Sequence, residues 1–118
     1  MRMSSASFKL LIMKLGYFCV KMTVAIRVEG RTAGMQRVEE RYVLYKARSE
    51  ADAIAKAEAA APAYGKLYYN SNGEQVRWQV ERIDAAYEVV LENPRSLDGA
   101  EVFSVLKTRK LTPERAWT

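Results

Sequence analysis

Apolar and polar residues alternate most clearly in residues 73–91, the longest strand-like stretch of the chain. The apolar positions are first even: Val76, Trp78 and Val80. From residue 83 they are odd: Ile83, Ala85, Tyr87, Val89 and Leu91. A regular strand would turn these two sets to opposite faces of a sheet. One extra residue near Glu81-Arg82, a β-bulge, would give them a common face, and a break in the strand is the alternative. We expect the bulge, because no Gly or Pro marks a turn there.

Two further alternating runs lie upstream of this stretch. Thr23–Glu29 reads as a strand, and Gln36–Arg48 reads as a second, with Val38, Tyr42 and Leu44 on its even face. Residues 30–34, which include two glycines, join the runs and predict a β-hairpin. Glu40 interrupts the even face, whereas Glu39 and Arg41 occupy the odd face.

A helix is expected to begin at Ser49. Its hydroxyl can cap the amide of Asp52, and the carboxylate of Asp52 suits the positive end of a helix. The following ADAIAKAEAAA is rich in strong helix formers, and Pro62 should end the element. The alanine-lined face allows close approach to a sheet but buries little area, so the sheet should hold the helix in place.

The remaining segments complete an α+β pattern. Residues 66–69 lead through an Asn-Ser-Asn-Gly turn into the long strand, and after a loop at 92–99 a last strand covers Glu101–Leu111. The tail that follows has Pro113 in a first-turn position. This order predicts one two-layer domain: an antiparallel sheet of four to five strands with one main helix on one face, β-β-α-β-β.

Residues 1–21 form a basic leader whose role stays open. They carry +4 of the net charge of +5, so the rest of the chain is close to neutral. Lysines interrupt the apolar run, which argues against a signal peptide or a membrane span. Three interpretations remain: a strand or helix that packs on the core, a surface segment, or a start assigned too early, with the single domain at 22–118 beginning at Met22.

Three segments together resemble a known family of small bacterial proteins. They read EERYVLYKARSEADAIAKAEAAA, YNSNGEQVRWQVERIDAAYEVV and GAEVFSVLKTRK. Their order and spacing are similar to the domain-of-unknown-function family 4288, over Thr23–Lys110. The departures are Ala51-Asp52-Ala53 near the helix start and the 21-residue leader. The resemblance implies a compact bacterial domain and implies no reaction.

Composition argues against several kinds of chemistry. The chain has no His and only Cys19, so neither an intrachain disulfide nor a Cys/His metal site can form. It also lacks a Gly-rich phosphate loop. We therefore expect no catalytic residues, no metal and no cofactor, and a non-enzymatic protein of the reducing cytoplasm.

Nine residues are candidates for binding: Glu39, Glu40, Arg41, Tyr42, Trp78, Tyr87, Lys107, Arg109 and Lys110. The favoured function is a protein-binding module, with a homodimer as one form, that uses an open sheet face or edge strand. One alternative is nucleic-acid binding through the leader and the basic strand end. Another is a small-molecule site near Glu40, Arg41 and Trp78, with Glu40 on the helix-facing side.

Each candidate also has a structural interpretation. Glu40 could pair across the sheet with Arg77 or Arg82. Trp78 sits in an apolar alternation and is expected in the core. A charged strand end can simply block aggregation between sheet edges.

Overall fold

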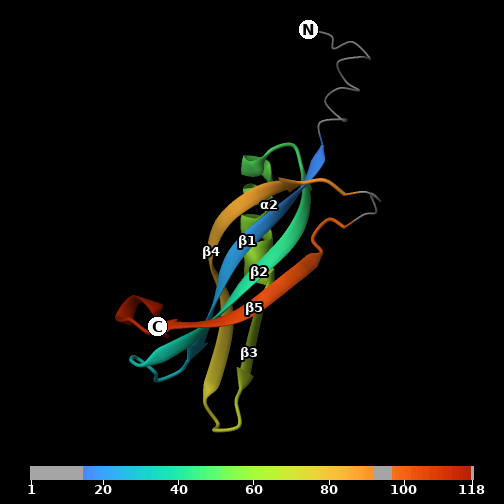
Figure 1. Cartoon of the computed structure of the whole chain (residues 1–118). Helices are drawn as coiled ribbons and strands as arrows, with labels where there is room; N and C mark the ends of the chain where they lie inside the picture. The colour runs from blue at the N-terminus through green and yellow to red at the C-terminus, as the bar shows by residue number, and fades with distance from the viewer. Residues whose placement is uncertain (1–14, 92–96, 118) are drawn as a thin grey trace, which may run out of the picture.

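The computed structural model describes residues 15–91 and 97–117, which form a five-stranded antiparallel sheet with one helix on one face (Figure 1). The strand order is β3-β4-β1-β2-β5. This confirms the α+β class. None of the helices in the described residues is both long and apolar enough to cross a membrane. The strands and main helix are β1 (Gly16–Val28), β2 (Met35–Ala47), α2 (Glu50–Ala60), β3 (Gly65–Tyr69), β4 (Gln75–Val89) and β5 (Glu101–Lys110). Two 3-10 turns, η1 (Ala61–Ala63) and η2 (Pro113–Arg115), follow α2 and β5.

The central strand is β1, which pairs with β2 on one side and with β4 on the other. It begins at Gly16 rather than at the predicted Thr23, so the expected boundary of this strand is wrong. Phe18 and Val20, which lie before that boundary, are buried in the core. Of the three interpretations of the leader, packing as a strand therefore holds for Gly16–Lys21, and residues 1–14 lie outside the described part.

The predicted hairpin of β1 and β2 is confirmed. Gly30 and Gly34 in its loop have φ values of 82° and 91°, which favour glycine. The paired ladder of the two strands ends at Ala25 and Val38, although both strands continue. Beyond that point β1 stays with β4 and β2 stays with β5, so this end of the sheet divides into two arms (Figure 1).

The long strand β4 contains two extra residues relative to β1. The register skips Glu81 between the partners of Thr23 and Val24, which confirms the bulge predicted near Glu81-Arg82. It also skips Asp84, where a second bulge occurs that the sequence did not predict. After two extra residues, the side chains of β4 that face the helix again stand at even positions, as they do before the first bulge. The expectation that Ala85 and Tyr87 share the face of Trp78 is therefore wrong, since Ala86 is the residue buried beneath α2.

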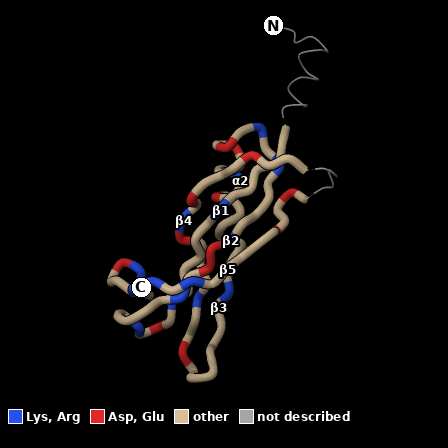
Figure 2. The backbone as a smooth tube through the Cα atoms, viewed as in Figure 1, with Lys and Arg blue, Asp and Glu red and all other residues tan. Residues whose placement is uncertain are grey.

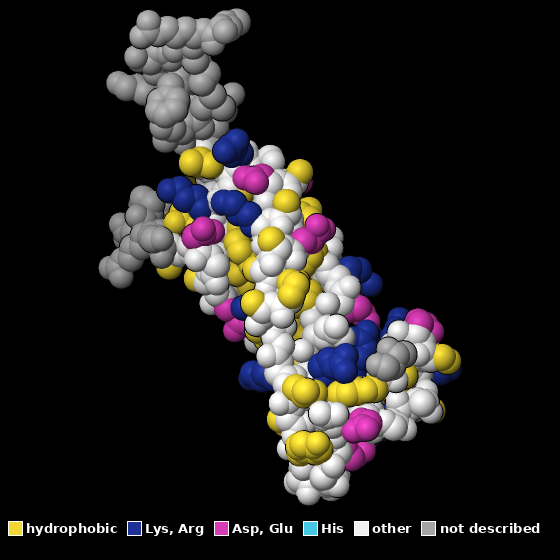
Figure 3. All heavy atoms as spheres, turned by 180° about the vertical axis from the view of Figure 1, so that it is seen from behind, with side chains coloured by type: hydrophobic (Ala, Val, Ile, Leu, Met, Phe, Trp, Pro, Cys, Tyr) yellow, Lys and Arg dark blue, Asp and Glu magenta, His cyan; other side chains and the backbone are white. Residues whose placement is uncertain are grey.

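The helix α2 begins as the sequence predicts. Ser49 Oγ accepts a hydrogen bond from the Asp52 amide at 3.1 Å, which confirms the N-cap. Ala53 and Ala57 are buried against the sheet, and their small side chains permit the close approach. Figure 3 shows this side of the molecule, with hydrophobic side chains over α2 and again near β3. The buried core comprises Phe18, Val20, Met22, Val24, Val43, Tyr45, Ala47, Ala53, Ala57 and Ala86.

Candidate interaction surface

The nine candidate residues are divided between the two faces of the sheet. Antiparallel partners share a face, and the even residues of β1 face α2. The helix side therefore carries Glu39, Arg41, Trp78 and Lys110. The outer side carries Glu40, Tyr42, Tyr87, Lys107 and Arg109. The expected helix-facing position of Glu40 is wrong, so Glu40 cannot share a site with Arg41 and Trp78.

On the helix side, Glu39 and Arg41 are held by Tyr64, which the sequence did not single out. The buried carboxylate of Glu39 accepts a hydrogen bond from Tyr64 Oη at 2.5 Å. The Arg41 guanidinium lies 3.8 Å from the centre of the Tyr64 ring and donates to Glu101 at 2.6 Å. Burial and the Glu39 contact raise the pKa of Tyr64 above its usual range, so the phenol stays a donor. This cluster fastens β2 to the segment after α2.

Trp78 is partly buried and packs against the core, but it also lines an open groove of about 570 Å³. The groove lies between η1, β3 and β4. The indole Nε1 of Trp78 donates to Tyr68 Oη at 3.1 Å, and Lys66 Nζ lies 5.4 Å from the ring centre. The indole is thus engaged by neighbours within the chain on its polar edge and on one face.

On the outer side, both bulges of β4 present carboxylates that bind side chains of other strands. Glu81 receives two hydrogen bonds of 2.8 Å from Arg109 and one of 3.4 Å from Arg27. Asp84 accepts from Thr23 Oγ1 at 2.7 Å. The hydrogen bonds from Arg109 hold the pKa of Glu81 below its usual value. We call Glu81, Arg109 and Arg27 the outer clasp.

Glu40 occupies the centre of a second outer-face group. Its carboxylate lies 3.0 Å from Lys107 Nζ and 3.9 Å from Lys21 Nζ. The expected partners Arg77 and Arg82 do not contact it within the described residues. The register explains the difference, because Glu40 pairs with Val105 on β5 and with Thr23 on β1. Each of these partners is two residues from one of the lysines and on the same face of its strand.

These ion pairs weaken the case for a nucleic-acid site. Of the basic strand end, Lys107 pairs with Glu40 and Arg109 is fixed in the outer clasp, which leaves Lys110 exposed. Figure 2 shows acidic and basic positions interspersed along the sheet rather than gathered into one basic stripe. Phosphate binding depends on available cations, and the described part of the chain offers few on this face.

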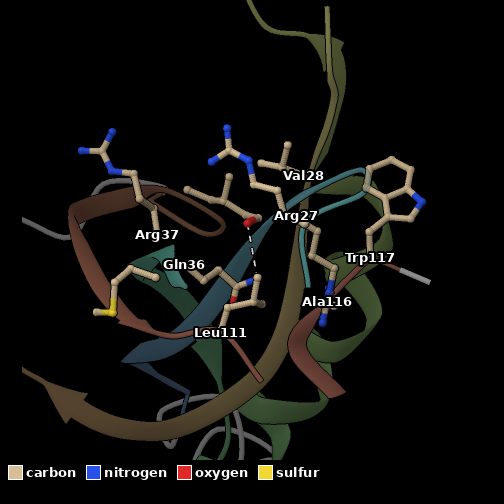
Figure 4. A pocket seen from close by; sticks show the side chains of 10 residues that line it. Arg27, Val28, Gln36, Arg37, Leu111, Ala116 and Trp117 are labelled. Carbon is tan, nitrogen blue, oxygen red and sulfur yellow. Dashed lines mark hydrogen bonds between the residues drawn. The ribbon is translucent and has the colours of Figure 1, made fainter. Parts of the chain in front are cut away.

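Where β1 and β2 separate, the C-terminal segment closes the gap. Buried Gln36 donates to Ile26 O at 3.4 Å and to Arg115 O at 2.9 Å, and it accepts from Arg109 Nε at 2.9 Å. A slot of about 100 Å³ remains beside it, lined by side chains from β1, β2 and the C-terminal segment (Figure 4). The slot is too small for most ligands and reads as a packing gap.

Both edge strands carry exposed large apolar side chains: Leu67, Tyr68 and Tyr69 on β3, and a second group on β5. Val102, Phe103 and Leu106 are 53%, 57% and 45% exposed, and the Phe103 ring lies 5.6 Å from that of Tyr42 on the outer face. Within the described residues, β5 pairs with β2 alone and forms an edge of the sheet. We call Val102–Leu106, a run of five uncharged residues, the edge run.

The main chain of the edge run has groups available for a further strand. Leu111 N–H donates to Gly34 O beside the pair Met35–Lys110, so the odd residues of β5 bond to β2. Antiparallel strands alternate in this respect, and the N–H and C=O groups of Ser104, Leu106 and Thr108 therefore point to the free edge. The sequence indicated β5 as a strand, but its alternation cannot show that the strand lies at an edge.

Comparison with known proteins places the chain in a family without assigning a role. No curated protein and no solved structure matches it. A family model described as "Domain of unknown function (DUF4288)" matches residues 17–104, from the second residue of β1 into the edge run of β5. This confirms the resemblance found in the sequence, and its start at residue 17 agrees with the β1 boundary. The chain belongs to the DUF4288 family.

Proposed function

We propose that this domain is a non-catalytic protein-binding module that adds an extended segment of another polypeptide to the free edge of β5. The observation that carries the proposal is the edge run, in which unpaired main-chain groups lie beside exposed apolar side chains. Proteins that bind in this way gain affinity from main-chain hydrogen bonds and specificity from side chains on alternate positions.

The two edges of the sheet differ in a way that supports β5 as the binding edge. β3 is short, with five residues, and the ammonium of its Lys66 lies over the Trp78 ring of β4. β5 has ten residues and five consecutive uncharged ones. Natural proteins usually blunt long apolar edges with charges, prolines or bulges. β5 has one bulge, at Val102, so its regular and uncharged stretch is Phe103–Leu106.

The outer face beside the edge run adds side-chain contact area. Phe103 and Tyr42 form an aromatic pair there, and both are at least partly exposed. Tyrosine and phenylalanine bury large areas at small entropic cost, which suits a binding surface. The half-buried Cys19 on the same face has a raised pKa because of burial, so it stays a thiol in a reducing compartment such as the bacterial cytoplasm.

A proline scan of the free edge tests the proposal. Ser104→Pro removes one N–H of the edge run without touching a bond to β2, and edge strands tolerate proline at such positions. Thr108→Pro is the matched control, since Thr108 faces the same edge outside the run. Immobilised full chain should retain partners from host extract in the wild-type and Thr108→Pro forms and lose them in Ser104→Pro.

Circular dichroism should show that both proline variants keep the wild-type spectrum. If folded Ser104→Pro protein captures the same set of proteins as the wild type, edge binding is wrong.

A further inference from the structure

We propose that the gap between β1 and β2, at the loop end of their hairpin, is a binding site for a short segment of a partner polypeptide. The chain's own C-terminal segment fills this site and competes with the partner. The site is separate from the free edge of β5, so the inference goes beyond the proposed function. The segment seated in the gap shows which chemistry the gap accepts.

The gap forms because β1 and β2 stop pairing after Ala25 and Val38, although both strands continue toward their loop. Ile26–Val28 and Met35–Arg37 therefore run past each other without forming a ladder. We call the space between these two segments the hairpin gap, and we call Leu111–Trp117, which closes it, the strap. The slot in Figure 4 is the part of the hairpin gap that the strap leaves unfilled.

Gln36 makes the hairpin gap a site that recognises main chain. Its side chain is 5% exposed, and its amide nitrogen donates to Arg115 O of the strap at 2.9 Å and to Ile26 O at 3.4 Å. Its oxygen accepts from Arg109 Nε at 2.9 Å, which fixes the direction of the amide. Buried polar groups require partners, so the hairpin gap selects a segment with a carbonyl at the position of Arg115.

Two side chains of the strap enter the hairpin gap on either side of the Pro113 turn. Leu111 and Ala116 are 7% and 6% exposed, and Leu111 N–H donates to Gly34 O at 2.7 Å. Pro113 begins the 3-10 turn η2 between them. A methyl group fits at position 116, whereas a larger side chain would displace packed neighbours. The hairpin gap therefore accepts an apolar residue and, five residues later, a small one.

Arg77 supplies an aromatic subsite beside the hairpin gap. It lies opposite Arg27 in the ladder of β1 and β4, and like charges directly opposite each other destabilise a sheet. Arg27 turns to Glu81, whereas Arg77 forms no ion pair within the described residues. The Arg77 guanidinium lies 4.2 Å from the centre of the Trp117 ring. A guanidinium that stacks on an aromatic ring in this way can select an aromatic side chain in a ligand.

These contacts define the partner segment. It carries an apolar residue, a proline turn, a small residue and an aromatic residue, in the spacing Leu-x-Pro-x-x-Ala-Trp of the strap. Because the strap is joined to β5, it acts at an effective concentration of about 1 mM or more. A partner must exceed the strap in affinity or concentration, which makes the strap an internal inhibitor of the site.

The strap is held weakly enough to leave the hairpin gap while the sheet stays folded. The ladder of β2 and β5 ends at the pair Met35–Lys110, and the strap follows as a 3-10 turn and irregular chain. Its main chain is joined to β2 and the hairpin loop by the bonds at Arg115 O and Leu111 N–H. Segments with few main-chain bonds and few buried side chains open locally, without global unfolding.

Fluorescence anisotropy of a labelled LTPERAW peptide tests the site in the full chain. Ala116→Glu places a charge at the buried position and Trp117→Ala removes the ring, so each weakens the strap without changing the walls of the hairpin gap. Both variants should bind the peptide with a dissociation constant on the order of 100 µM, and the wild type at least about ten-fold more weakly. Glu114→Gln, at an exposed position of the same strap, should behave as the wild type.

Circular dichroism should show that the variants keep the wild-type fold, and Trp117→Ala preserves the test if Ala116→Glu unfolds the chain. Folded strap variants that bind the peptide no more tightly than the wild type overturn the inference. Arg77→Ala in the Trp117→Ala background should weaken binding about five-fold. An unchanged affinity would place the peptide elsewhere and would also overturn the inference.

The same samples distinguish other occupants and the other proposed site. If the wild type sediments as a dimer that Ala116→Glu converts to a monomer, the strap of a second copy fills the hairpin gap, and the partner proposed here is wrong. Ser104→Pro in the Trp117→Ala background should leave the peptide affinity unchanged. A loss would place the peptide at the β5 edge and overturn the hairpin gap as its site. Failure here leaves the proposed function standing, because that function is judged by capture from extract with Ser104→Pro.

Discussion

Replacing Glu81 with glutamine removes the anion of the outer clasp while nearly keeping the side chain's shape. In the folded protein this carboxylate faces Arg109 and Arg27, and the three side chains are 22%, 17% and 15% exposed. Hydrogen bonds to charged groups contribute about 1.5–3 kcal/mol each, and a cation left without its buried partner costs about 3–5 kcal/mol. Partial solvation reduces this cost. We expect Glu81→Gln to lower the free energy of unfolding by about 2 kcal/mol.

Urea denaturation followed by circular dichroism at neutral pH measures this loss. The slope of the unfolding free energy against urea concentration should not change, and the midpoint of thermal unfolding should fall by roughly 8 °C. Glu74→Gln is the matched control, because Glu74 also has a pKa lowered by an arginine, Arg31, but its ion pair is exposed. Surface pairs contribute little, so this variant should be much closer to wild type.

The pH dependence of the stability difference shows whether the loss comes from the charge of Glu81 or from its packing. The folded-state pKa of Glu81 lies below its unfolded value, chiefly because Arg109 donates to it. Its contribution is therefore complete above the unfolded pKa, about 4.3, and is lost as pH falls through the folded value. The gap between wild type and Glu81→Gln should narrow below about pH 4. A variant within about 0.5 kcal/mol of wild type at pH 7, or a difference in stability that does not narrow as the pH falls below about 4, refutes the electrostatic account.

Three further changes test the fold. Ser49→Ala removes the N-cap bond to Asp52 and should reduce stability by about 1 kcal/mol in thermal unfolding; an unchanged midpoint contradicts the cap. Tyr64→Phe leaves the buried Glu39 carboxylate without its donor and should cost about 1–2 kcal/mol in urea, whereas a neutral effect means that water replaces the hydroxyl. A chain that starts at Met22 lacks half of the central strand and should not unfold cooperatively; a cooperative transition contradicts the β1 boundary.

Local patterns in the sequence predict much of this fold. Period-two alternation locates β2, β4 and β5, the Ser49 cap starts α2, and the parity change after Val80 reveals the Glu81 bulge. Each of these depends on residues close together in the chain. Backbone propensity, capping and pleat operate within a few residues, which is why they can be read without coordinates.

Other features of the fold cannot be recognised from residues that are close together in the sequence. The second bulge, at Asp84, precedes Ala85-Ala86, and two adjacent alanines suit either face of the sheet. The alternation of apolar and polar residues therefore does not reveal this bulge. The start of β1 is obscured because Lys21 and Cys19 occupy its outer face and resemble the end of a leader. The strand pattern is clear only after residue 22, although the core begins with Phe18.

Assigning the faces of β2 likewise requires the assembled sheet. Val38, Tyr42 and Leu44 on one side and Val43 and Tyr45 on the other are equally suited to burial. α2 covers the odd side, which sends Glu40 outward to Lys107 and turns Glu39 inward to Tyr64. None of these partners is near in sequence to Glu39 or Glu40.

The chain alone determined its class, its element types, its capped helix, its lack of histidine and its lack of an intrachain disulfide. Only the tertiary structure decided that β1 is central and β5 is an edge, and hence which main-chain groups remain available for another strand. The physical reason is that strand pairing joins residues far apart in the sequence. Whether a given strand ends up enclosed or open depends on the order in which all five strands assemble.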